Sequence, residues 1–395
     1  MKEGRLISLG EGLASIPIEL LQAQATGGIL FIVGAGVSQN SGLPSFRNLV
    51  VKTYKNLDLA VYNHIQNLED PRSFIPEEYP DLNPSQLAEV KAFINNEYDL
   101  TLGLLERRYF FESRLKTRVR STVASILYDQ KVKPSSLHED IIKLSDRGTG
   151  LAVITTNFDV LLEEAAKKLK KPQRTYSLGE IMRPSFSPEF SGILHIHGTA
   201  DPNDLAHELV LTDEDFGLYY LRGRSIPDFI YDAARLYSIV LIGYSANDPP
   251  MKYLLSAVSA DYSRFTDIKP RYAFIGKESN DLIENASWKG RGIQPIHYDV
   301  IGNNHSALAR TLAQWTKFVQ SKDREIYFEK ELLRIIKKTP HDTTLSNMDR
   351  FELIFYLSSA PTRKKLLTKI SEEKSRFEWL DIALKVDSDG IEGVS

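Results

Sequence analysis

Short apolar runs alternate with amphipathic segments along most of the chain. Runs of this length without polar alternation are typical of strands in a parallel sheet whose two faces are both covered. The segments between them carry apolar residues at helical spacing. This alternation predicts an α/β fold, a Rossmann-like doubly wound parallel sheet. The apolar runs cover residues 29–33, 151–156, 193–196, 238–243, 272–276 and 294–298.

A stretch near residues 51–133 departs from this alternation, because it is helical in pattern almost throughout. Its strongest part, residues 98–128, spaces its apolar residues for buried helix faces. We interpret the stretch as a helical insertion beside a nucleotide-binding domain, with aromatic residues that form its core. Helices are also expected over residues 12–26 and 305–319, and one is expected to open at Thr212 by capping chemistry.

The C-terminal segment, residues 319–395, contains only helical patterns. Short amphipathic helices are rarely stable alone. We expect this helical tail to pack on the main domain, residues 1–318, or to form an interface with another chain. The patterns cover residues 326–337, 348–357 and 361–370.

Composition excludes several classes of function. The 395 residues carry a formal net charge of −3, and no basic stripe with interleaved aromatics is present, so we expect no direct binding to nucleic acid. No apolar run approaches the roughly 18 residues of a membrane helix, which predicts a cytoplasmic protein that does not bind membranes. The chain has no cysteine, which rules out disulfides, thiolate catalysis and a cysteine zinc site.

A glycine-rich loop follows the first buried run. The strand ending at Val33 leads into Gly34, Ala35 and Gly36, and the amides that follow would open a helix, a place where anions bind. Gln39 stands where the dinucleotide fingerprint has its third glycine, and no acidic strand end follows about twenty residues later. The loop therefore does not indicate a redox dehydrogenase. Its continuation to an aromatic residue and a cation suits a nucleotide that is acted upon.

Polar side chains follow two later strands. Asn157 and Asp159 come after the run that ends at Thr156, and His197 follows the run over residues 193–196. Open α/β sheets bind ligands at the carboxyl ends of their strands. His195 alternates with His197, which predicts that both side chains point to one face. Two histidines at this spacing are compatible with a metal site, but no third ligand follows at a suitable spacing.

Four motifs in this order carry a family resemblance. Gly34-Ala-Gly-Val-Ser38 and Ser41-Gly-Leu-Pro-Ser-Phe-Arg47 resemble the sirtuin signature, with Ser45 where sirtuin deacylases usually have Asp. The later stretches Ile154–Asp159, Leu194–Gly198 and Ile242–Asp248 fit the same family. The resemblance covers roughly residues 14–318.

The resemblance implies a particular branch of the family. Sirtuin deacylases carry a zinc ribbon held by four cysteines, which this chain cannot build, so it is more similar to the zinc-free sirtuin-like proteins of bacterial defence systems that cleave NAD. It implies catalytic roles for Asn157, His197 and Asp159, with His197 as the base. The residues expected to bind the nucleotide are Gly34, Ala35, Gly36, Ser38, Ser45, Phe46, Arg47, Thr156, Gly243 and Ser245.

We therefore expect an NAD+ glycohydrolase that depletes NAD+ in an abortive anti-phage response, with NAD+ as its substrate and no zinc. The resemblance implies a homo-oligomer and a hexameric HerA-type ATPase as partner. The alternative is a subunit that binds NAD+ or ADP-ribose without turnover, which Ser45 favours. Protein deacylation is disfavoured because the zinc ribbon is absent.

Overall fold

The computed structural model divides into two compact units, residues 28–305 and residues 1–27 together with 306–395. The sheet lies in the first unit. The domain boundary expected near residue 318 is not tested by this division and stays a prediction. The structure describes residues 6–68, 74–113, 117–128, 132–148, 150–178, 191–200, 208–244, 268–277, 282–302, 304–320, 329–330, 332–338, 360–372 and 378–380.

The unit over residues 28–305 is built on a seven-stranded sheet in which every pairing is parallel, with the order β5-β6-β4-β3-β7-β8-β9. The predicted α/β class and parallel sheet are confirmed. All six predicted strands are present, and a two-residue edge strand, β5, was not expected. The strands are β3 (Ile29–Val33), β4 (Ala152–Thr155), β5 (Thr175–Tyr176), β6 (Gly192–His195), β7 (Ser238–Ile242), β8 (Arg271–Lys277) and β9 (Gln294–Asp299).

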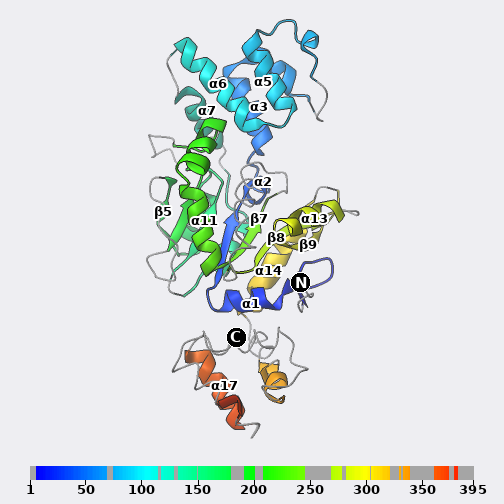
Figure 1. The fold of residues 1–395 in the computed structure, drawn as a ribbon, viewed down its shortest axis with the longest axis vertical. Coiled ribbons are helices and arrows are strands. Elements are labelled where there is room, and N and C mark those ends of the chain that lie inside the picture. The colour runs from blue at the N-terminus through cyan, green and yellow to red at the C-terminus, as the bar shows by residue number, and fades with distance from the viewer. Residues whose placement is uncertain are drawn as a thin grey trace. The chain divides into compact units, whose positions relative to one another are not determined.

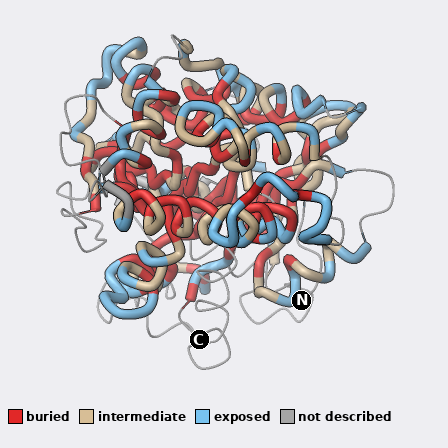
Figure 2. The backbone as a smooth tube through the Cα atoms, turned by 90° about the horizontal axis from the view of Figure 1, so that it is seen from above, coloured by how far each residue is buried: buried red, intermediate tan, exposed pale blue. Residues whose placement is uncertain are grey.

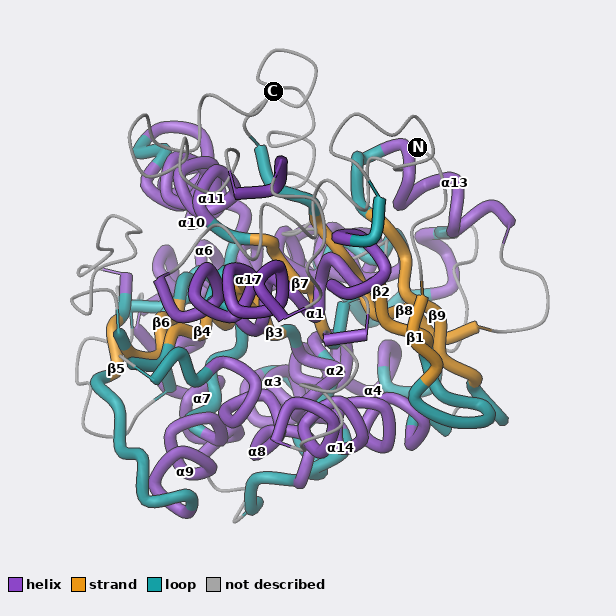
Figure 3. Tube along the Cα trace, turned by 90° about the horizontal axis from the view of Figure 1, so that it is seen from below, coloured by secondary structure: helices purple, strands orange, loops and turns teal. Residues whose placement is uncertain are grey.

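The central strands are apolar because helices cover both faces of the sheet. Every residue of β3 and β7 is buried, and Figure 2 shows buried backbone in red in the interior. Figure 3 shows α11 (Ser225–Leu236) and α13 (Leu282–Gly290) on one side of the sheet, with α8 (Ser136–Ser145) and α9 (Leu161–Lys168) on the other. Chain order reverses at β3, which pairs with β4 on one side and with β7 on the other. Such reversal points are where open α/β sheets bind ligands.

A group of helices follows α2 (Ala35–Gln39), in the region where the sequence predicts a helical insertion (Figure 1). Its core joins apolar residues of every α-helix in the group, together with Leu209 and Leu211 from the segment after β6. The helices are α3 (Phe46–Leu57), α4 (Leu59–Ile65), the short 3₁₀ turn Pro76–Glu78, α5 (Pro84–Ile94), α6 (Tyr98–Ser113) and α7 (Thr117–Tyr128).

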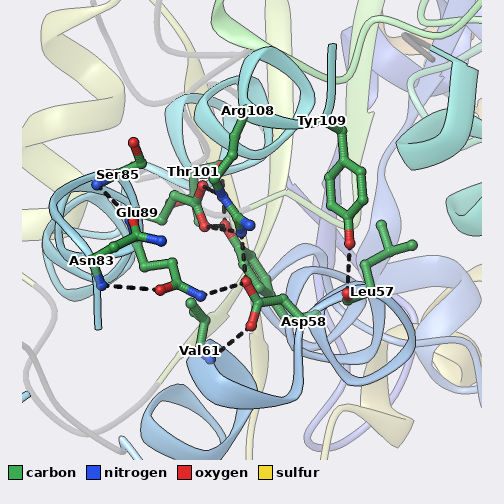
Figure 4. A network of polar contacts seen from close by, with 11 residues as sticks. Leu57, Asp58, Val61, Asn83, Ser85, Glu89, Thr101, Arg108 and Tyr109 are labelled. Carbon is green, nitrogen blue, oxygen red and sulfur yellow. Dashed lines mark hydrogen bonds and ion pairs between the residues drawn. The ribbon is translucent and has the colours of Figure 1, made fainter. Parts of the chain in front are cut away.

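A buried ionic network also holds the insertion together (Figure 4). The Arg108 guanidinium bonds to Glu89 at 2.7 Å through Nε and to Asp58 at 2.7 Å through Nη2. The Glu89 side chain is fully buried, and its second oxygen accepts from Tyr54 at 3.0 Å. One arginine on α6 therefore compensates two carboxylates, Asp58 at the start of α4 and Glu89 on α5.

The other unit contains a two-stranded antiparallel ribbon, β1 (Leu6–Ser8) and β2 (Ser15–Pro17), followed by α1 (Ile18–Ala25). The helix expected over residues 12–26 therefore begins only at Ile18, because residues 15–17 pair with β1 and Pro17 has no N–H for a helix interior. Helices α14 (Ser306–Gln320) and α17 (Ala360–Glu372) match predicted patterns. The helix expected over residues 348–357 lies outside the described residues.

Within the described ranges, every helix is too short or too polar to cross a bilayer.

Candidate active site

A pocket opens at the carboxyl ends of β3, β4 and β6, three neighbouring strands. Its volume is about 680 Å³, including a mouth open to solvent. Side chains from the strand ends form its polar wall, and side chains from the helical insertion form much of its apolar wall. The lining residues are Ala35, Ser38, Leu43, Pro44, Phe46, Leu49, Leu127, Thr156, Asn157, Phe158, Asp159, His197, Val210 and Phe216.

The glycine loop lies against the end of β7. The amide of Gly34 donates to the carbonyl of Ile242 at 2.8 Å, and that of Gly36 donates to the carbonyl of Gly243 at 3.0 Å. A Cβ atom added to Gly34 would lie 2.6 Å from the Tyr244 ring, and one added to Gly36 would lie 3.0 Å from the Cα of Gly243. Close backbone packing thus accounts for both glycines, and their contact with a nucleotide stays a prediction.

Asn157 links the glycine loop to the end of β4. Its Nδ2 donates to the Gly34 carbonyl at 3.2 Å and to the Ser38 hydroxyl at 3.0 Å. Because both amide hydrogens are used, the amide oxygen is the group that Asn157 offers to a ligand in the pocket. Its backbone N–H donates a hydrogen bond to Oγ1 of Thr155 at 3.0 Å. The side chain is therefore held in one orientation.

Ser38 is the meeting point of three polar side chains. Besides Asn157, it contacts Nε2 of His138 at 3.4 Å and forms a hydrogen bond with Asp159. The Nδ1 of His138 accepts from the backbone N–H of Ser135 at 3.2 Å, so the proton of this ring lies on Nε2 and points to Ser38. Burial lowers the pKa of His138 to about 4, which keeps the ring neutral.

Asp159 lies on the pocket wall just before α9. One of its oxygens accepts from the backbone amide of Leu161 at 3.1 Å. Loss of water around the carboxylate raises its pKa, and the hydrogen bond from Ser38 and the charge of His195 offset part of that rise. Asp159 can therefore accept a hydrogen bond from a ligand.

His197 is a buried, neutral imidazole on the pocket wall. Burial lowers its pKa to about 3. Its Nε2 lies 2.5 Å from the hydroxyl of Tyr220, and its ring stands edge-on to Phe216 with the centroids 5.7 Å apart. A neutral imidazole has one nitrogen lone pair, so it can accept a hydrogen bond from a ligand, and it takes a proton at neutral pH only where the bound ligand raises this lowered pKa.

His195 serves a different place from His197. Its Nδ1 lies 2.9 Å from the carbonyl of Asn157, and its Nε2 lies 2.9 Å from the carboxylate of Glu163. The prediction that both histidines share one face is wrong, because β6 ends at His195 and the next two residues form a turn that redirects His197. Among the described residues, no group of three or more His, Asp or Glu side chains is placed to hold a metal ion.

The pocket brings together only part of the predicted set. Ala35, Ser38, Phe46, Thr156, Asn157, Asp159 and His197 line it. Ser45 instead caps α3, where its hydroxyl accepts from the Asn48 amide at 3.3 Å. Arg47 lies over the Phe93 ring, 5.2 Å from its centroid, and also contacts Tyr98. Gly243 packs on the glycine loop, and Ser245 lies outside the described residues.

Three residues that support the site are not predicted as site residues from the sequence, although His138 is recognisable there as a histidine at a helix start that could reach a site. His138 begins a helix and Glu163 lies in the first turn of another, so each has an ordinary local explanation. Tyr220 lies on a π-helical turn, Gly217–Arg222, that follows α10 (Asp213–Phe216). The helix opening at Thr212 is predictable from its capping residues, but the wide turn that follows has no such signal.

Comparison with known protein families finds a match that covers most of the polar wall of the pocket. Residues 151–296 match the SIR2-like domain. This part of the chain is thus similar to SIR2-like domains. It contains Asn157, Asp159 and His197, whereas the glycine loop precedes the matched residues.

One individual relative and two solved structures are similar to larger parts of the chain. An uncharacterized protein of Sinorhizobium fredii, y4cA, is 31% identical over 296 residues, which is 73% of this chain and 22% of the relative's own length. The chain thus spans about a fifth of that relative. A Sir2 enzyme structure shares 14% identity and a TM-score of 0.37, covering 78% of this chain and 100% of its own. A variant Sir2 homologue in complex with ADP-ribose shares 15% identity and a TM-score of 0.38, covering 79% of this chain and 99% of its own.

Proposed function

We propose that this chain is an NAD+ glycohydrolase, which cleaves the bond between nicotinamide and ribose and releases nicotinamide and ADP-ribose. The observation that carries the proposal is the pocket itself, in which Asn157, Asp159 and His197 line one wall at the ends of neighbouring strands. The SIR2-like match supports it, because the matched residues include all three.

The reaction needs a positioned nicotinamide leaving group, surroundings that accommodate an oxocarbenium-like ribose, and a water molecule directed at the anomeric carbon. The C–N bond breaks with its electron pair going to the nicotinamide nitrogen, and the ribose becomes an oxocarbenium-like centre. The amide oxygen of Asn157 holds the attacking water or a ribose hydroxyl. The Asp159 carboxylate accepts a hydrogen bond from the nicotinamide carboxamide.

His197 receives the proton that must leave. As the water oxygen bonds to the anomeric carbon, one water proton passes to the neutral imidazole and is later released to solvent. The apolar wall formed by Phe46, Leu49 and Leu127 limits the access of other water molecules to the cation.

A second candidate function keeps NAD+ or ADP-ribose as a ligand but has no turnover. Ser45 favours it, because sirtuin deacylases have Asp at this position and here the hydroxyl caps α3 instead. Protein deacylation is less favoured, because the chain has no cysteine for a zinc ribbon.

In the cell, we place this activity in an abortive anti-phage response, as the resemblance to zinc-free sirtuin-like defence proteins implies. An enzyme that destroys NAD+ must be held inactive until infection. Self-assembly into a homo-oligomer and a hexameric HerA-type ATPase partner are the expected means of control.

The decisive experiment measures NAD+ consumption and nicotinamide release by the purified chain. Asn157→Ala and His197→Ala should each lower turnover by about 100-fold or more, as loss of an acid–base or positioning group does. Asn56→Ala and His64→Ala are matched controls in the helical insertion, and they should keep wild-type turnover. Tight NAD+ binding without nicotinamide release, at any protein concentration, would favour the regulatory alternative.

A partner experiment follows the same assay. Turnover per chain is measured at rising concentration and then with a cognate HerA-type ATPase added. Turnover that rises with assembly supports control by oligomerisation, whereas constant turnover per chain contradicts it.

A further inference from the structure

The hydroxyl of Tyr220 forms a hydrogen bond with the ring of His197. The two atoms, Oη of Tyr220 and Nε2 of His197, lie 2.5 Å apart. Both side chains are buried, with exposed fractions of 6% and 3%. A short hydrogen bond away from bulk water is strong and directional. Tyr220 therefore decides how the ring of His197 is oriented.

Ring packing fixes the same geometry. The Tyr220 and Phe216 rings lie 5.5 Å apart, and each also contacts the His197 ring at centroid distances below 6 Å. Phe216 lines the pocket, so the three rings join the pocket wall to the π-helical turn. Rotation of His197 would disturb both aromatic contacts as well as the hydrogen bond.

A neutral imidazole carries one N–H, and its position decides which nitrogen can accept a proton. With the hydrogen on Nε2, the ring donates to Tyr220 and its Nδ1 keeps a lone pair. With the hydrogen on Nδ1, the ring can only donate to a ligand. The first tautomer is the one that a general base needs, and its Nε2 hydrogen requires an acceptor such as the phenolic oxygen.

We propose that Tyr220 is a positioning residue of this site, whose phenolic oxygen accepts a hydrogen bond from Nε2 of His197 and so reserves Nδ1 for the proton taken from the ligand. The inference rests on the proposed function for its catalytic meaning. When Nδ1 accepts the proton, the resulting imidazolium keeps its Nε2 hydrogen on Tyr220. No proton passes to the tyrosine.

The segment that carries Tyr220 is itself anchored on the helical insertion. Arg107 of α6 forms an ion pair with Asp213 at 3.0 Å. Arg120 of α7 bonds to Asp215 at 2.8 Å and to the Leu209 carbonyl at 2.6 Å. Both carboxylates belong to α10, directly before the π-helical turn. These contacts fix the position of α10 against α6 and α7, and the turn that follows α10 therefore holds Tyr220 beside His197.

The first test is the tautomer of His197, measured by ¹⁵N NMR on the labelled full chain without substrate. The signal is assigned by its absence in His197→Gln, which is feasible with eight histidines. The expected result is a hydrogen on Nε2 at neutral pH in the wild type, and mixed tautomers in Tyr220→Phe. A hydrogen on Nδ1 in the wild type would overturn the proposal, and this readout does not depend on turnover.

The second test is kinetic. Tyr220→Phe keeps the ring volume and should lower kcat by about 10- to 100-fold with KM within about twofold. It should also move the acid limb of the kcat profile to lower pH, because the imidazolium loses its acceptor. Tyr219→Phe, one position away and lining a different hollow of the surface, is the matched control and should change neither quantity.

The outcomes separate the two proposals. A wild-type chain without NAD+ turnover overturns the glycohydrolase, while the tautomer still tests Tyr220. An active wild type in which Tyr220→Phe leaves kcat and the acid limb unchanged, or raises kcat, overturns the role of Tyr220 alone.

Discussion

His195 points one ring nitrogen at the carboxylate of Glu163, 2.9 Å away, while its other nitrogen faces the carbonyl of Asn157. Both partners accept hydrogen bonds, so both ring nitrogens carry hydrogen and the ring is an imidazolium. Burial lowers its pKa, but the charge and hydrogen bond of Glu163 outweigh burial and raise the pKa above 6.5. A buried cation thus holds the backbone of the residue that offers its amide oxygen to the pocket.

Glu163→Gln should therefore destabilise the fold and disturb Asn157. Breaking a buried ion pair costs roughly 3–5 kcal/mol in the free energy of unfolding. A histidine with a raised pKa contributes stability that is complete below about 6.5 and is lost as pH rises through the folded-state value. Urea unfolding between pH 6 and 9 should show this alkaline loss in the wild type and not in Glu163→Gln. The exposed neighbour Glu164→Gln is the control, and an equal effect there would contradict the assignment.

The two neutral histidines His138 and His197 predict the opposite behaviour in acid. The pKa of His138 is lowered to about 4 and that of His197 to about 3. The unfolded chain therefore binds protons first, and stability is lost as pH falls from about 6.5 towards these values. For His138 the full loss is roughly 3 kcal/mol.

Urea unfolding of His138→Gln between pH 4 and 7 measures how much of the stability lost on acidification comes from His138. The variant should lose less stability on acidification than the wild type. His64→Gln, in the insertion and partly exposed, should retain the wild-type slope. Identical slopes in all three proteins would show that His138 takes up protons equally in both states.

Close packing of the glycine loop predicts a sharp difference between two glycines. A Cβ atom at position 34 would lie 2.7 Å from the backbone carbonyl oxygen of Gly243, which cannot rotate away. Gly34→Ala should therefore destabilise the chain by about 1–3 kcal/mol, the usual cost of overpacking. At Gly290 an added Cβ meets nothing within 4 Å, so Gly290→Ala is the matched control in thermal unfolding. Equal melting temperatures for both variants would contradict the contact.

The network in Figure 4 predicts a large effect far from the pocket. Arg108→Gln leaves Glu89 buried without its cation and should cost roughly 3–5 kcal/mol in unfolding free energy. The double variant Glu89→Gln/Arg108→Gln removes the orphaned charge and should recover part of that loss. A double variant as unstable as the sum of the two single variants would show that the pair does not act as a unit.

The central strands β3 and β7 could be predicted most directly from the sequence, because each is a short, almost wholly apolar run, as is typical of a sheet covered on both faces. The gathering of Asn157, Asp159 and His197 could be predicted for a related reason, since the ends of parallel strands meet at one edge. Their catalytic roles stay predictions.

The supporting residues could not be predicted, because their meaning depends on partners distant in the chain. Glu163 is recognisable only beside His195, and Tyr220 only beside His197. Pairing within residues 15–17 was missed for the same reason, because the partner strand β1 is three residues long and has no pattern of its own. Arg47, which is expected to bind the nucleotide, lies over the aromatic ring of Phe93 in the insertion.

The ion pairs of Arg107 and Arg120 link the helical insertion to α10, which constrains both the design of chimeras and the divergence of related sequences. Helices α6 and α7 and the α10 segment form one exchangeable part, although about a hundred residues separate them in the sequence. A chimera that receives a foreign helical insertion but keeps its own α10 would leave Asp213 and Asp215 without their arginines. Grafting therefore succeeds only when both segments are transferred together, and related chains should vary at these positions as a linked set.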